Sequence, residues 1–463
     1  MTPDVRAWVA LVLLGCSGSE VPAVPKATTT TPPSVLVVVL DTVRADRTAL
    51  GGQAAGRTPQ LAGIAAAGTT WTQVTAPGPW TWPSHASLFT GEPPWVHGAH
   101  GASREDGMAL KDTLRVTPLR DDLPTLAERF QQAGYRCEAA VANRLLSGPL
   151  GLTRGFDPVF HDAQDDAVID EAIRRLDGPE PLFLFVNLMT AHSPYHPVDV
   201  GPVKPADVAN QAWTAPFRTG TGLSFFTTTP SGQETFARGE LDIPPEGLQL
   251  LDGLYSGEVV AVDRHLNRLL TAWQAARPDA IIAVTSDHGE YLGEHRLLGH
   301  SASTYSQVTH VPLVLSGPGI PRGVSSDRPV QLQDLYGTLL DLAGIEATDH
   351  SLARPDSMPV DRAIQSAAWV RPHLAESVGG RLSVPWRTHR RGDEAVVVYG
   401  DTIELYDLST DPHMLRDLSA ERPERAAQLA EEARSSIPMT ETAGGLQVDA
   451  ELIEQLEQLG YIQ

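Results

Sequence analysis

The sequence predicts an α/β fold in which helices flank a doubly wound, mostly parallel sheet, with a small C-terminal α+β subdomain. Strands are expected where apolar residues run almost without interruption, as in parallel strands covered on both faces. These runs are Val35–Leu40, Tyr135–Ala142, Pro181–Leu188, Ile281–Ser286 and Val311–Leu315. Helices are expected between them, at Pro59–Ala67, Leu123–Ala133, Asp165–Leu176 and Gly253–Ala275. This alternation is typical of a doubly wound domain.

The rest of the chain divides around this pattern. We expect the main domain to span residues 34–345, because the alternation of strands and helices weakens after it. Residues 346–463 form the predicted subdomain, in which 394-EAVVVYGDTIELYDLSTDP-412 indicates short antiparallel strands and the stretch from Val448 a terminal helix. The region 197–250 is rich in Pro, Gly and Thr, which indicates an insertion or lid.

The composition is that of a globular protein and excludes a nucleic-acid partner. Hydrophobic residues make up 41% of the 463 residues and charged residues 20%, which is ordinary for a folded chain. The net charge is −22, and no basic stripe is visible that could bind phosphate backbones. An acidic surface also repels anionic substrates, so a site for an anion would need positive charge from a metal or histidines.

The N-terminus predicts a lipid anchor. Residues 1–15 have the features of a signal peptide, and the ending Leu13-Leu14-Gly15-Cys16 resembles the lipobox of bacterial lipoproteins. Residues 16–33 then form a Ser/Thr/Pro-rich tether. We therefore expect the protein in the bacterial cell envelope, outside the cytoplasm and held to the membrane by lipidated Cys16. A disordered apolar start with an incidental cysteine is the alternative. Cys137 is expected to be a buried small residue.

Polar residues follow the predicted strands at the edge where chemistry takes place in such sheets. Asp41 follows the first strand, the pair Asp287-His288 follows another, and His192 comes after the strand that ends at Leu188. Carboxylates and imidazole brought together at strand ends are ligands for a divalent metal. The sequence therefore predicts a metal site at this edge of the sheet.

The stretch 79-PWTWPSHASLFTG-91 offers a hydroxyl to the same site. Thr81 lies two residues before Pro83, and proline is favoured in the first turn of a helix. A hydroxyl next to a metal loses its proton more easily and becomes a nucleophile, and the helix N-terminus would favour an anionic ester. The alternative is that Thr81 only caps the helix. Elsewhere, the acidic run Asp162–Asp166 is expected to be a solvated surface segment.

Taken together, these segments are similar to a known family. The chain resembles the sulfatases of the alkaline phosphatase superfamily over nearly all of residues 34–463. The resemblance rests on the order and spacing of its motifs. They are VVVLDTVRAD, TPQLAGIAAAGTTW, PSHASLFTG, LPTLAERFQQAGY, FLFVNLMTAHSPY, TSDHGEYLGEH, VPLVLSGPG, ELYDLSTDP and the ending Leu459-Gly460-Tyr461.

The resemblance implies a ligand set and a nucleophile. Asp41, Asp287 and His288 match metal ligands of the family. Thr81 matches its catalytic nucleophile, which also contacts the metal. No convincing second set of ligands is visible in the sequence, so one divalent metal ion is expected. Manganese, zinc or magnesium fits better than calcium, because Thr42 stands where many sulfatases have a second ligating aspartate.

The resemblance also implies roles for three histidines. His192 matches a histidine that contacts the ester or protonates the leaving group. His85 occupies the position of an arginine that supports the nucleophile in sulfatases. His300 lies near the position of a cationic group that contacts the substrate oxygens. For His85 and His300, a buried hydrogen-bonded histidine is an equal alternative.

Two departures from the family concern the chemistry. Sulfatases carry Cys or Ser at the nucleophile position, in a Cys-x-Pro-Ser-Arg signature that is converted to formylglycine. Thr81 cannot give that aldehyde. A lysine and a histidine of the family are also lost near Ala142-Asn143-Arg144. Phosphoryl-transfer branches of the superfamily, by contrast, use an unmodified Thr or Ser.

These features predict a metal-dependent hydrolase that cleaves a phosphate, phosphonate or sulfate ester through Thr81. A small-molecule, glycan or lipid ester is the expected substrate, and phosphorus esters, especially diesters, are favoured over sulfate esters. One alternative is an envelope transferase for phospho-headgroups, although related transferases usually carry several membrane spans. The other is a catalytically inactive sulfatase-like binding protein, which retention of the metal ligands disfavours.

The lipid anchor can be tested directly. Replacement Cys16→Ala removes the thiol that would be lipidated, so the variant should be released in soluble form or fail to mature. Membrane fractionation of expressing cells measures this, with Cys137→Ala as the matched cysteine control. A Cys16→Ala variant that stays with the membranes as the wild type does would contradict the anchor.

Overall fold

The computed structural model describes most of the chain between residues 32 and 439. The described ranges are 32–101, 108–111, 114–148, 150–195, 202–208, 210–219, 222–223, 231–301, 303–370 and 372–439. The predicted signal peptide, Cys16 and the terminal helix from Val448 lie outside them. Among the described residues, no helix combines the length and the apolar composition needed to cross a membrane.

A nine-stranded sheet forms the centre of the protein, with strand order β14-β2-β13-β10-β1-β7-β5-β6 and β15 beside β2. The strands are β1 (Val35–Leu40), β2 (Thr69–Thr75), β5 (Arg136–Val141), β6 (Val159–His161), β7 (Leu182–Leu188), β10 (Ile281–Thr285), β13 (His310–Ser316), β14 (Val324–Ser326) and β15 (Val330–Gln331). Every run that the sequence analysis assigned to a strand is therefore a strand, with ends shifted by one residue at most. The mostly parallel α/β fold is confirmed.

One side of the sheet departs from the predicted parallel pairing. β1 pairs in parallel with both β10 and β7, and β5 pairs in parallel with β7 and β6. β13, however, runs antiparallel to β10 and to β2. A buried antiparallel strand is as continuously apolar as a parallel one, so the run of apolar residues could not reveal its direction. β2 was not predicted, because its TTWTQVT sequence is too polar for the same test.

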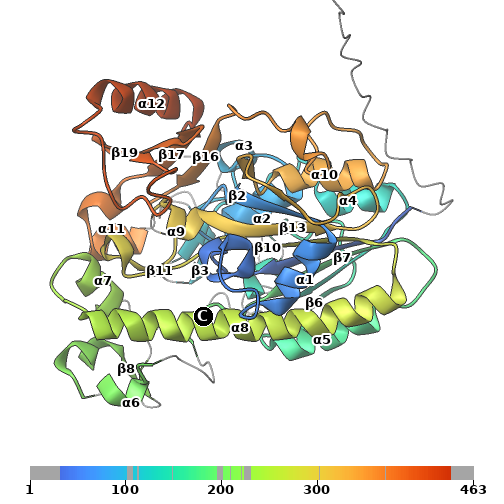
Figure 1. Cartoon of the computed structure of the whole chain (residues 1–463), viewed down its shortest axis with the longest axis horizontal. Helices are drawn as coiled ribbons and strands as arrows, with labels where there is room; N and C mark the ends of the chain where they lie inside the picture. The colour runs from blue at the N-terminus through green and yellow to red at the C-terminus, as the bar shows by residue number, and fades with distance from the viewer. Residues whose placement is uncertain are drawn as a thin grey trace, which may run out of the picture.

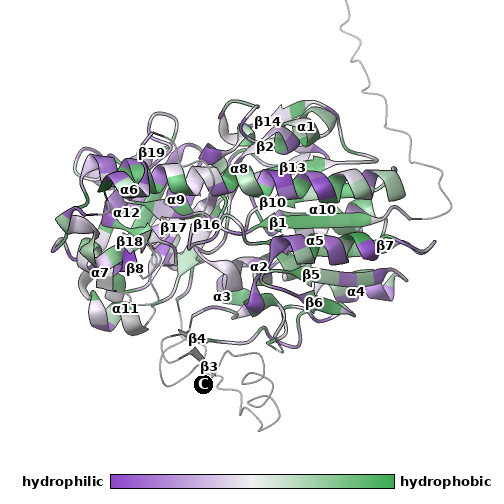
Figure 2. Cartoon of the chain, turned by 90° about the horizontal axis from the view of Figure 1, so that it is seen from below, coloured by the Kyte–Doolittle hydropathy of each residue, from purple (hydrophilic) through white to green (hydrophobic). Residues whose placement is uncertain are grey.

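Alternate residues of β1 pack against helices on opposite faces of the sheet. Val35, Val37 and Val39 belong to one core cluster and Leu36, Val38 and Leu40 to another. The first face is covered by α2 (Thr81–Thr90), α4 (Leu126–Gln132) and α10 (Asp334–Leu342), and the second by α1 (Pro59–Ala67), α5 (Asp165–Arg174) and α8 (Pro245–Ala276). Figure 1 shows α8 along one side of the sheet beside α5, and Figure 2 shows the hydrophobic central strands between helices of mixed polarity.

The predicted insertion 197–250 is partly helical. It contains α6 (Pro205–Val208) and α7 (Ser231–Ala237), and its last residues form the first turns of α8. This helix has 32 residues and so begins eight residues before the predicted Gly253. Pro245 lies at its N-terminus, where proline is tolerated, so the proline that suggested a loop in fact starts the helix.

A separate four-stranded antiparallel sheet follows the main sheet in the sequence. Its strands are β16 (Ile364–Ala368), β17 (Trp386–Arg391), β18 (Glu394–Tyr399) and β19 (Thr402–Asp407), covered by α12 (Pro423–Ser436). It lies at one end of the main sheet in Figure 1. Within β16, the Ser366 hydroxyl donates to the Ala76 carbonyl (2.5 Å) and the Ala367 N–H donates to the Pro77 carbonyl (3.0 Å). The small sheet thereby holds the chain just before α2.

A buried carboxylate from α8 caps the N-terminus of α1. Thr58 precedes α1 but makes no side-chain cap. The two oxygens of Asp263 instead accept hydrogen bonds from the N–H groups of Gln60 and Leu61, each at 3.0 Å. These N–H groups have no acceptor within their own helix, so Asp263 joins α8 to α1 through otherwise unpaired donors.

Replacement Asp263→Ala should lower the free energy of unfolding by about 2 kcal/mol, because a buried pair of helix N–H groups loses its charged acceptor. Asp263→Asn should cost less, since its remaining carbonyl oxygen still accepts one bond. Thermal and urea unfolding measure the effect, with the exposed Asp279→Asn as control. Equal stability of Asp263→Ala and Asp279→Asn would show that the cap contributes nothing.

Candidate active site

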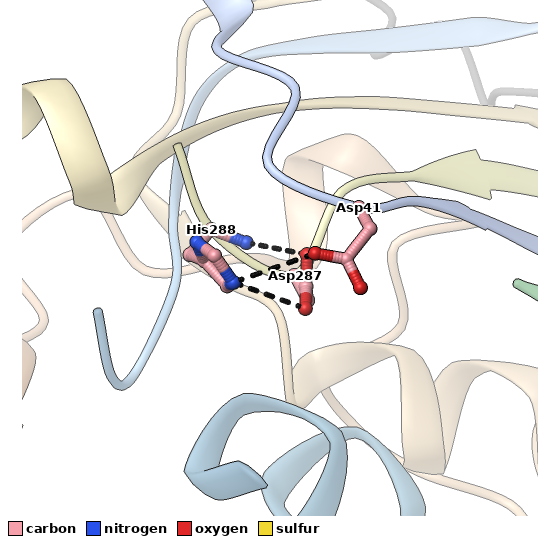
Figure 3. A group of neighbouring side chains, drawn as sticks. All are labelled: Asp41, Asp287 and His288. Atoms are coloured by element: carbon pink, nitrogen blue, oxygen red, sulfur yellow. Dashed lines mark hydrogen bonds and ion pairs between the residues drawn. The ribbon is translucent and has the colours of Figure 1, made fainter. Parts of the chain in front are cut away.

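Asp41, Asp287 and His288 converge at one edge of the main sheet. Val39 of β1 is paired with Thr285 of β10, so Asp41 and Asp287 each follow two residues after paired positions on neighbouring parallel strands. All three side chains are fully buried, and one ligand atom from each lies within 4.8 Å of the others. Figure 3 shows the three side chains directed toward one another. The predicted convergence is therefore present in the structure.

The atoms of Asp41, Asp287 and His288 that face one another are all hydrogen-bond acceptors. Asp41 Oδ1 and Asp287 Oδ2 are buried without a hydrogen-bond donor. His288 Nδ1 lies 2.9 Å from the Gly289 carbonyl and must donate to it, which leaves an unprotonated Nε2. This nitrogen lies 3.6 Å from Asp41 Oδ1 and 3.4 Å from Asp287 Oδ2. Three buried lone pairs at such distances repel one another unless a cation or proton lies between them. The donor set therefore fits a divalent metal ion.

The pKa values of the three groups reflect the same lack of a compensating cation. Burial raises the pKa of Asp287 to about 7, and burial together with the charge of Asp287 raises the pKa of Asp41. Burial lowers the pKa of His288 to about 3. Without a cation, each group is thus driven toward its neutral form, and a bound cation would reverse this for the carboxylates.

The other oxygen of each carboxylate is held by donors. Asp41 Oδ2 accepts from Asn143 Nδ2 at 2.8 Å and from Asn187 Nδ2 at 3.3 Å. Asp287 Oδ1 accepts from the backbone N–H groups of His288 at 2.9 Å and Thr42 at 3.3 Å. Such outer contacts fix the orientation of metal ligands. Each aspartate therefore has one braced oxygen and one oxygen directed into the cluster.

Thr42 does not add a ligand. Its hydroxyl donates to the Asp41 carbonyl at 2.7 Å instead of entering the cluster. Its φ of 62° lies in the left-handed region, which costs a β-branched residue about 1–3 kcal/mol. The contact between its N–H and Asp287 offers a reason for keeping this backbone conformation.

Thr81 does not act as the helix cap, so that alternative is wrong. α2 begins at Thr81 itself, its N-cap is Trp80, and no side chain caps it. The buried Thr81 Oγ1 instead lies 3.5 Å from His288 Nε2 and accepts from Asn143 Nδ2 at 3.2 Å. The hydroxyl is therefore directed at the carboxylate and histidine cluster, as a nucleophile or ligand would be.

His85 lies one helical turn after Thr81 in α2. Its Nδ1 is 2.9 Å from the Thr81 carbonyl and 3.5 Å from Asp287 Oδ2, and its ring packs edge-on against Phe185. The ring is completely buried, and burial lowers the pKa of His85 to about 4. His85 is thus a neutral support for the Thr81 backbone, in keeping with the buried alternative of the sequence analysis.

His192 and His300 lie on the side of the cluster formed by His288. The rings of His192 and His300 have centroids 5.1 Å apart, and those of His288 and His300 are 4.5 Å apart. His300 Nδ1 lies 3.0 Å from Glu290 Oε1, and His192 Nδ1 lies 2.7 Å from the Ser193 carbonyl. Both histidines are only partly buried, so both can meet a substrate.

Asp165 was expected to be solvated, but it is buried and organises the turn that leads to His192. Its carboxylate accepts from the N–H groups of Met189 and Thr190, both at 2.8 Å, and from the Thr190 hydroxyl at 2.5 Å. The acidic run alone gave no sign of this, because the turn it binds lies after a different strand. Cys137, in contrast, is buried as predicted.

Two asparagines of the site were not predicted. Asn187 is the sixth residue of β7, and Asn143 follows β5 by two residues. The Asn187 side-chain oxygen accepts from the Asn143 backbone N–H at 2.9 Å, so the two asparagines are linked to each other. Asn143 could have been found by the rule that identified Asp41, since it also follows a strand of the same sheet. Asn187 is the one polar residue in an otherwise apolar strand.

Comparison with known proteins identifies the family. The sequence profile of the Sulfatase family matches residues 33–345, which is more than half of the chain. The chain belongs to the sulfatase family. It is therefore an ester-cleaving hydrolase of a family whose enzymes use a metal ion.

Similar proteins support this sulfatase-family membership along the chain. A sulfatase from Formosa agariphila is 24% identical over 469 aligned positions that cover 88% of this chain and 86% of the relative. Among solved structures, a 2-O GAG sulfatase has a TM-score of 0.64 at 21% identity and covers 87% of this chain and 90% of its own. The phosphonate monoester hydrolase of Agrobacterium radiobacter has a TM-score of 0.62 at 19% identity, with 92% and 96% covered. At these identities the structures establish the shared fold.

Replacement Asp287→Asn should remove most of the bound metal from this sulfatase-family protein. Asparagine keeps an oxygen for the N–H groups of Thr42 and His288 but replaces the unpaired Oδ2 by an NH2 group. Since losing only an outer partner of a ligand weakens metal affinity about 10–100-fold, losing a ligand should cost at least that. Metal analysis of purified protein measures it, with Asp334→Asn in the remote pair with Arg362 as control. Full occupancy in Asp287→Asn would exclude this site.

Proposed function

We propose that this protein is a metal-dependent hydrolase that uses the unmodified Thr81 hydroxyl to cleave a phosphate, phosphonate or sulfate ester. The observation that carries the proposal is the position of Thr81 Oγ1, which makes no helix cap and faces His288 Nε2. Asp41, Asp287, His288 and Thr81 itself would hold the ion. When bound there, a divalent cation would lower the pKa of the hydroxyl and offset the charge of an anionic ester.

The chain's own residues supply the rest of the reaction. Thr81 Oγ loses its proton to solvent and forms a bond to phosphorus or sulfur, while the bond from that atom to the leaving oxygen breaks. His192, in its doubly protonated form, gives the leaving oxygen a proton from Nε2, the ring nitrogen not directed at the Ser193 carbonyl. Water then cleaves the Thr81 ester and gives up one proton to His192, and the second hydrogen remains on the released acid or Thr81. His300, oriented by Glu290, would contact the ester oxygens.

Phosphorus is the favoured centre, because threonine cannot use the route open to formylglycine. The hydrate of formylglycine expels sulfate by collapsing to the aldehyde, whereas a threonine sulfate must be split at sulfur by water. Water can attack a threonine phosphate or phosphonate in line when charge on the phosphoryl oxygens is offset. The similar fold of a phosphonate monoester hydrolase is compatible with this choice.

The charge of the site favours an ester with one negative charge. Within the described part of the chain, the other side chains that contact Thr81, Asp41 and Asp287 are asparagines and histidines. None of them is Lys or Arg. A dianionic monoester would gain little from these neutral groups. We therefore infer that diesters, or monoesters of a phosphonate, suit the site best, carried on a small molecule, glycan or lipid. The N-terminal motif further supports placing the enzyme in the cell envelope as a Cys16 lipoprotein.

Replacement Thr81→Ala should abolish ester hydrolysis, because no other hydroxyl is directed at the cluster by the contacts described. Aryl sulfates, phosphate monoesters, phosphate diesters and phosphonate monoesters are compared by kcat/KM, with and without added metal ions. The wild type should favour the diester or phosphonate over the sulfate. Co-expression with a formylglycine-generating enzyme should leave its intact mass unchanged, whereas the double variant T81C/H85R, which restores the sulfatase signature, serves as the positive control.

Two results would contradict this proposal. A wild-type protein that hydrolyses aryl sulfates with the highest kcat/KM would overturn the preference for phosphorus. A Thr81→Ala protein with wild-type turnover would overturn the nucleophile.

A further inference from the structure

Asn143 occupies a buried position between the proposed nucleophile and a carboxylate of the cluster. Its Nδ2 lies 2.8 Å from Asp41 Oδ2 and 3.2 Å from Thr81 Oγ1, so one amide group donates to both. Only 6% of Asn143 and 3% of Thr81 are exposed. One NH2 group can keep both hydrogen bonds only if the amide does not rotate.

The orientation of the Asn143 amide is fixed by its other contacts. Its Oδ1 accepts from the Leu145 N–H at 3.0 Å and caps the short 3-10 turn Arg144–Leu146. Its own N–H donates to Asn187 Oδ1 at 2.9 Å. Since the oxygen is engaged by a backbone donor, the NH2 group is the end that faces Thr81.

The contact with Asn143 limits where the Thr81 hydroxyl can point. Because Thr81 Oγ1 accepts from Asn143, its own proton points elsewhere, and its other polar contact described is His288 Nε2 at 3.5 Å. The Asn143 amide does not titrate near pH 7, so it can hold this hydroxyl without adding charge or taking part in proton transfer.

We propose that Asn143 is a positioning residue for the reaction, which holds Thr81 Oγ in the attacking rotamer through its Nδ2 donor. This inference rests on the proposed function of Thr81 as nucleophile. It assigns to Asn143 an effect on the rate of bond formation that is separate from its support of Asp41. Asn187 also donates to Asp41 Oδ2, so that carboxylate keeps a donor when Asn143 is changed.

The test uses Asn143→Ser, whose hydroxyl can still cap the turn at Leu145 but is too short to reach Thr81. Asn267→Ser, an exposed asparagine of α8, is the matched control. Each protein is assayed with whichever of bis(p-nitrophenyl) phosphate, phenyl p-nitrophenylphosphonate and p-nitrophenyl sulfate the wild type turns over fastest. kcat and KM are measured at saturating metal. The metal dissociation constant, the Tm and the ester adduct on the Thr81 peptide are measured separately.

The expected result is a fall in kcat of about 10²-fold or more for Asn143→Ser at saturating metal, as for misplacement of a reacting atom, with KM and Tm close to wild type. The metal dissociation constant should rise by about 10–100-fold at most, as for loss of one outer partner of a ligand. Build-up of the Thr81 adduct should slow by the same factor. Asn267→Ser should behave as the wild type in all measurements.

Other outcomes overturn the inference. Wild-type kcat in Asn143→Ser, with Thr81→Ala inactive, removes the role of Asn143 and leaves the proposed function standing. A loss of activity that saturating metal restores would mean that Asn143 acts only by bracing Asp41. Full activity in Thr81→Ala would remove the proposed function itself, and this inference with it.

Discussion

Parallel pairing of β1 with β10 brings Asp41 and Asp287 to the same sheet edge, and the rest of the site is arranged around these two buried carboxylates. Carboxylates removed from water are costly unless hydrogen bonds and an opposite charge compensate them. Donors from Asn143, Asn187 and two backbone N–H groups stabilise one oxygen of each. The remaining oxygens face the lone pair of His288, so the cluster is stable only with a proton or cation between them.

The segment that carries Thr81 is held to this cluster by rigid elements. Strand β16 of the small sheet binds the backbone at Ala76 and Pro77, just before α2. His85 packs against Phe185, and its Nδ1 contacts the Thr81 carbonyl. Side chains placed by strands and helices are more precisely oriented than those on loops. The small C-terminal sheet thus contributes to the site without supplying a ligand among the residues described.

Family membership and the details of the site answer different questions. The sulfatase family profile and the similar structures establish the fold and the class of reaction. A shared fold does not decide which ester is cleaved, because that depends on the groups around the reacting atoms. Here those groups are a threonine hydroxyl, neutral amides and a buried neutral histidine. The proposed preference for a singly charged phosphorus ester rests on this combination.

Much of the fold and the cluster could be predicted from the sequence, because local patterns encode them. Continuous apolar runs located β1, β5, β7, β10 and β13, and the polar residues that follow β1 and β10 identified Asp41, Asp287 and His288 as neighbours. Such predictions succeed because the ends of parallel strands necessarily meet at one edge. The direction of β13 and the existence of the polar strand β2 were missed, since pairing depends on residues far apart in the chain.

Only the tertiary structure decided what each polar side chain contacts. Thr81 had two possible roles in the sequence, and its distance to His288 and Asn143 excluded the cap. Asp165 belonged to an acidic run, yet it binds a turn after β7. The strand-end rule could have found Asn143, but Asn187 lies within β7, and its bond to Asp41 is visible only in the structure. Hydrogen bonds act over about 3 Å, so they depend on how separate segments pack, and periodicity along the chain does not contain that information.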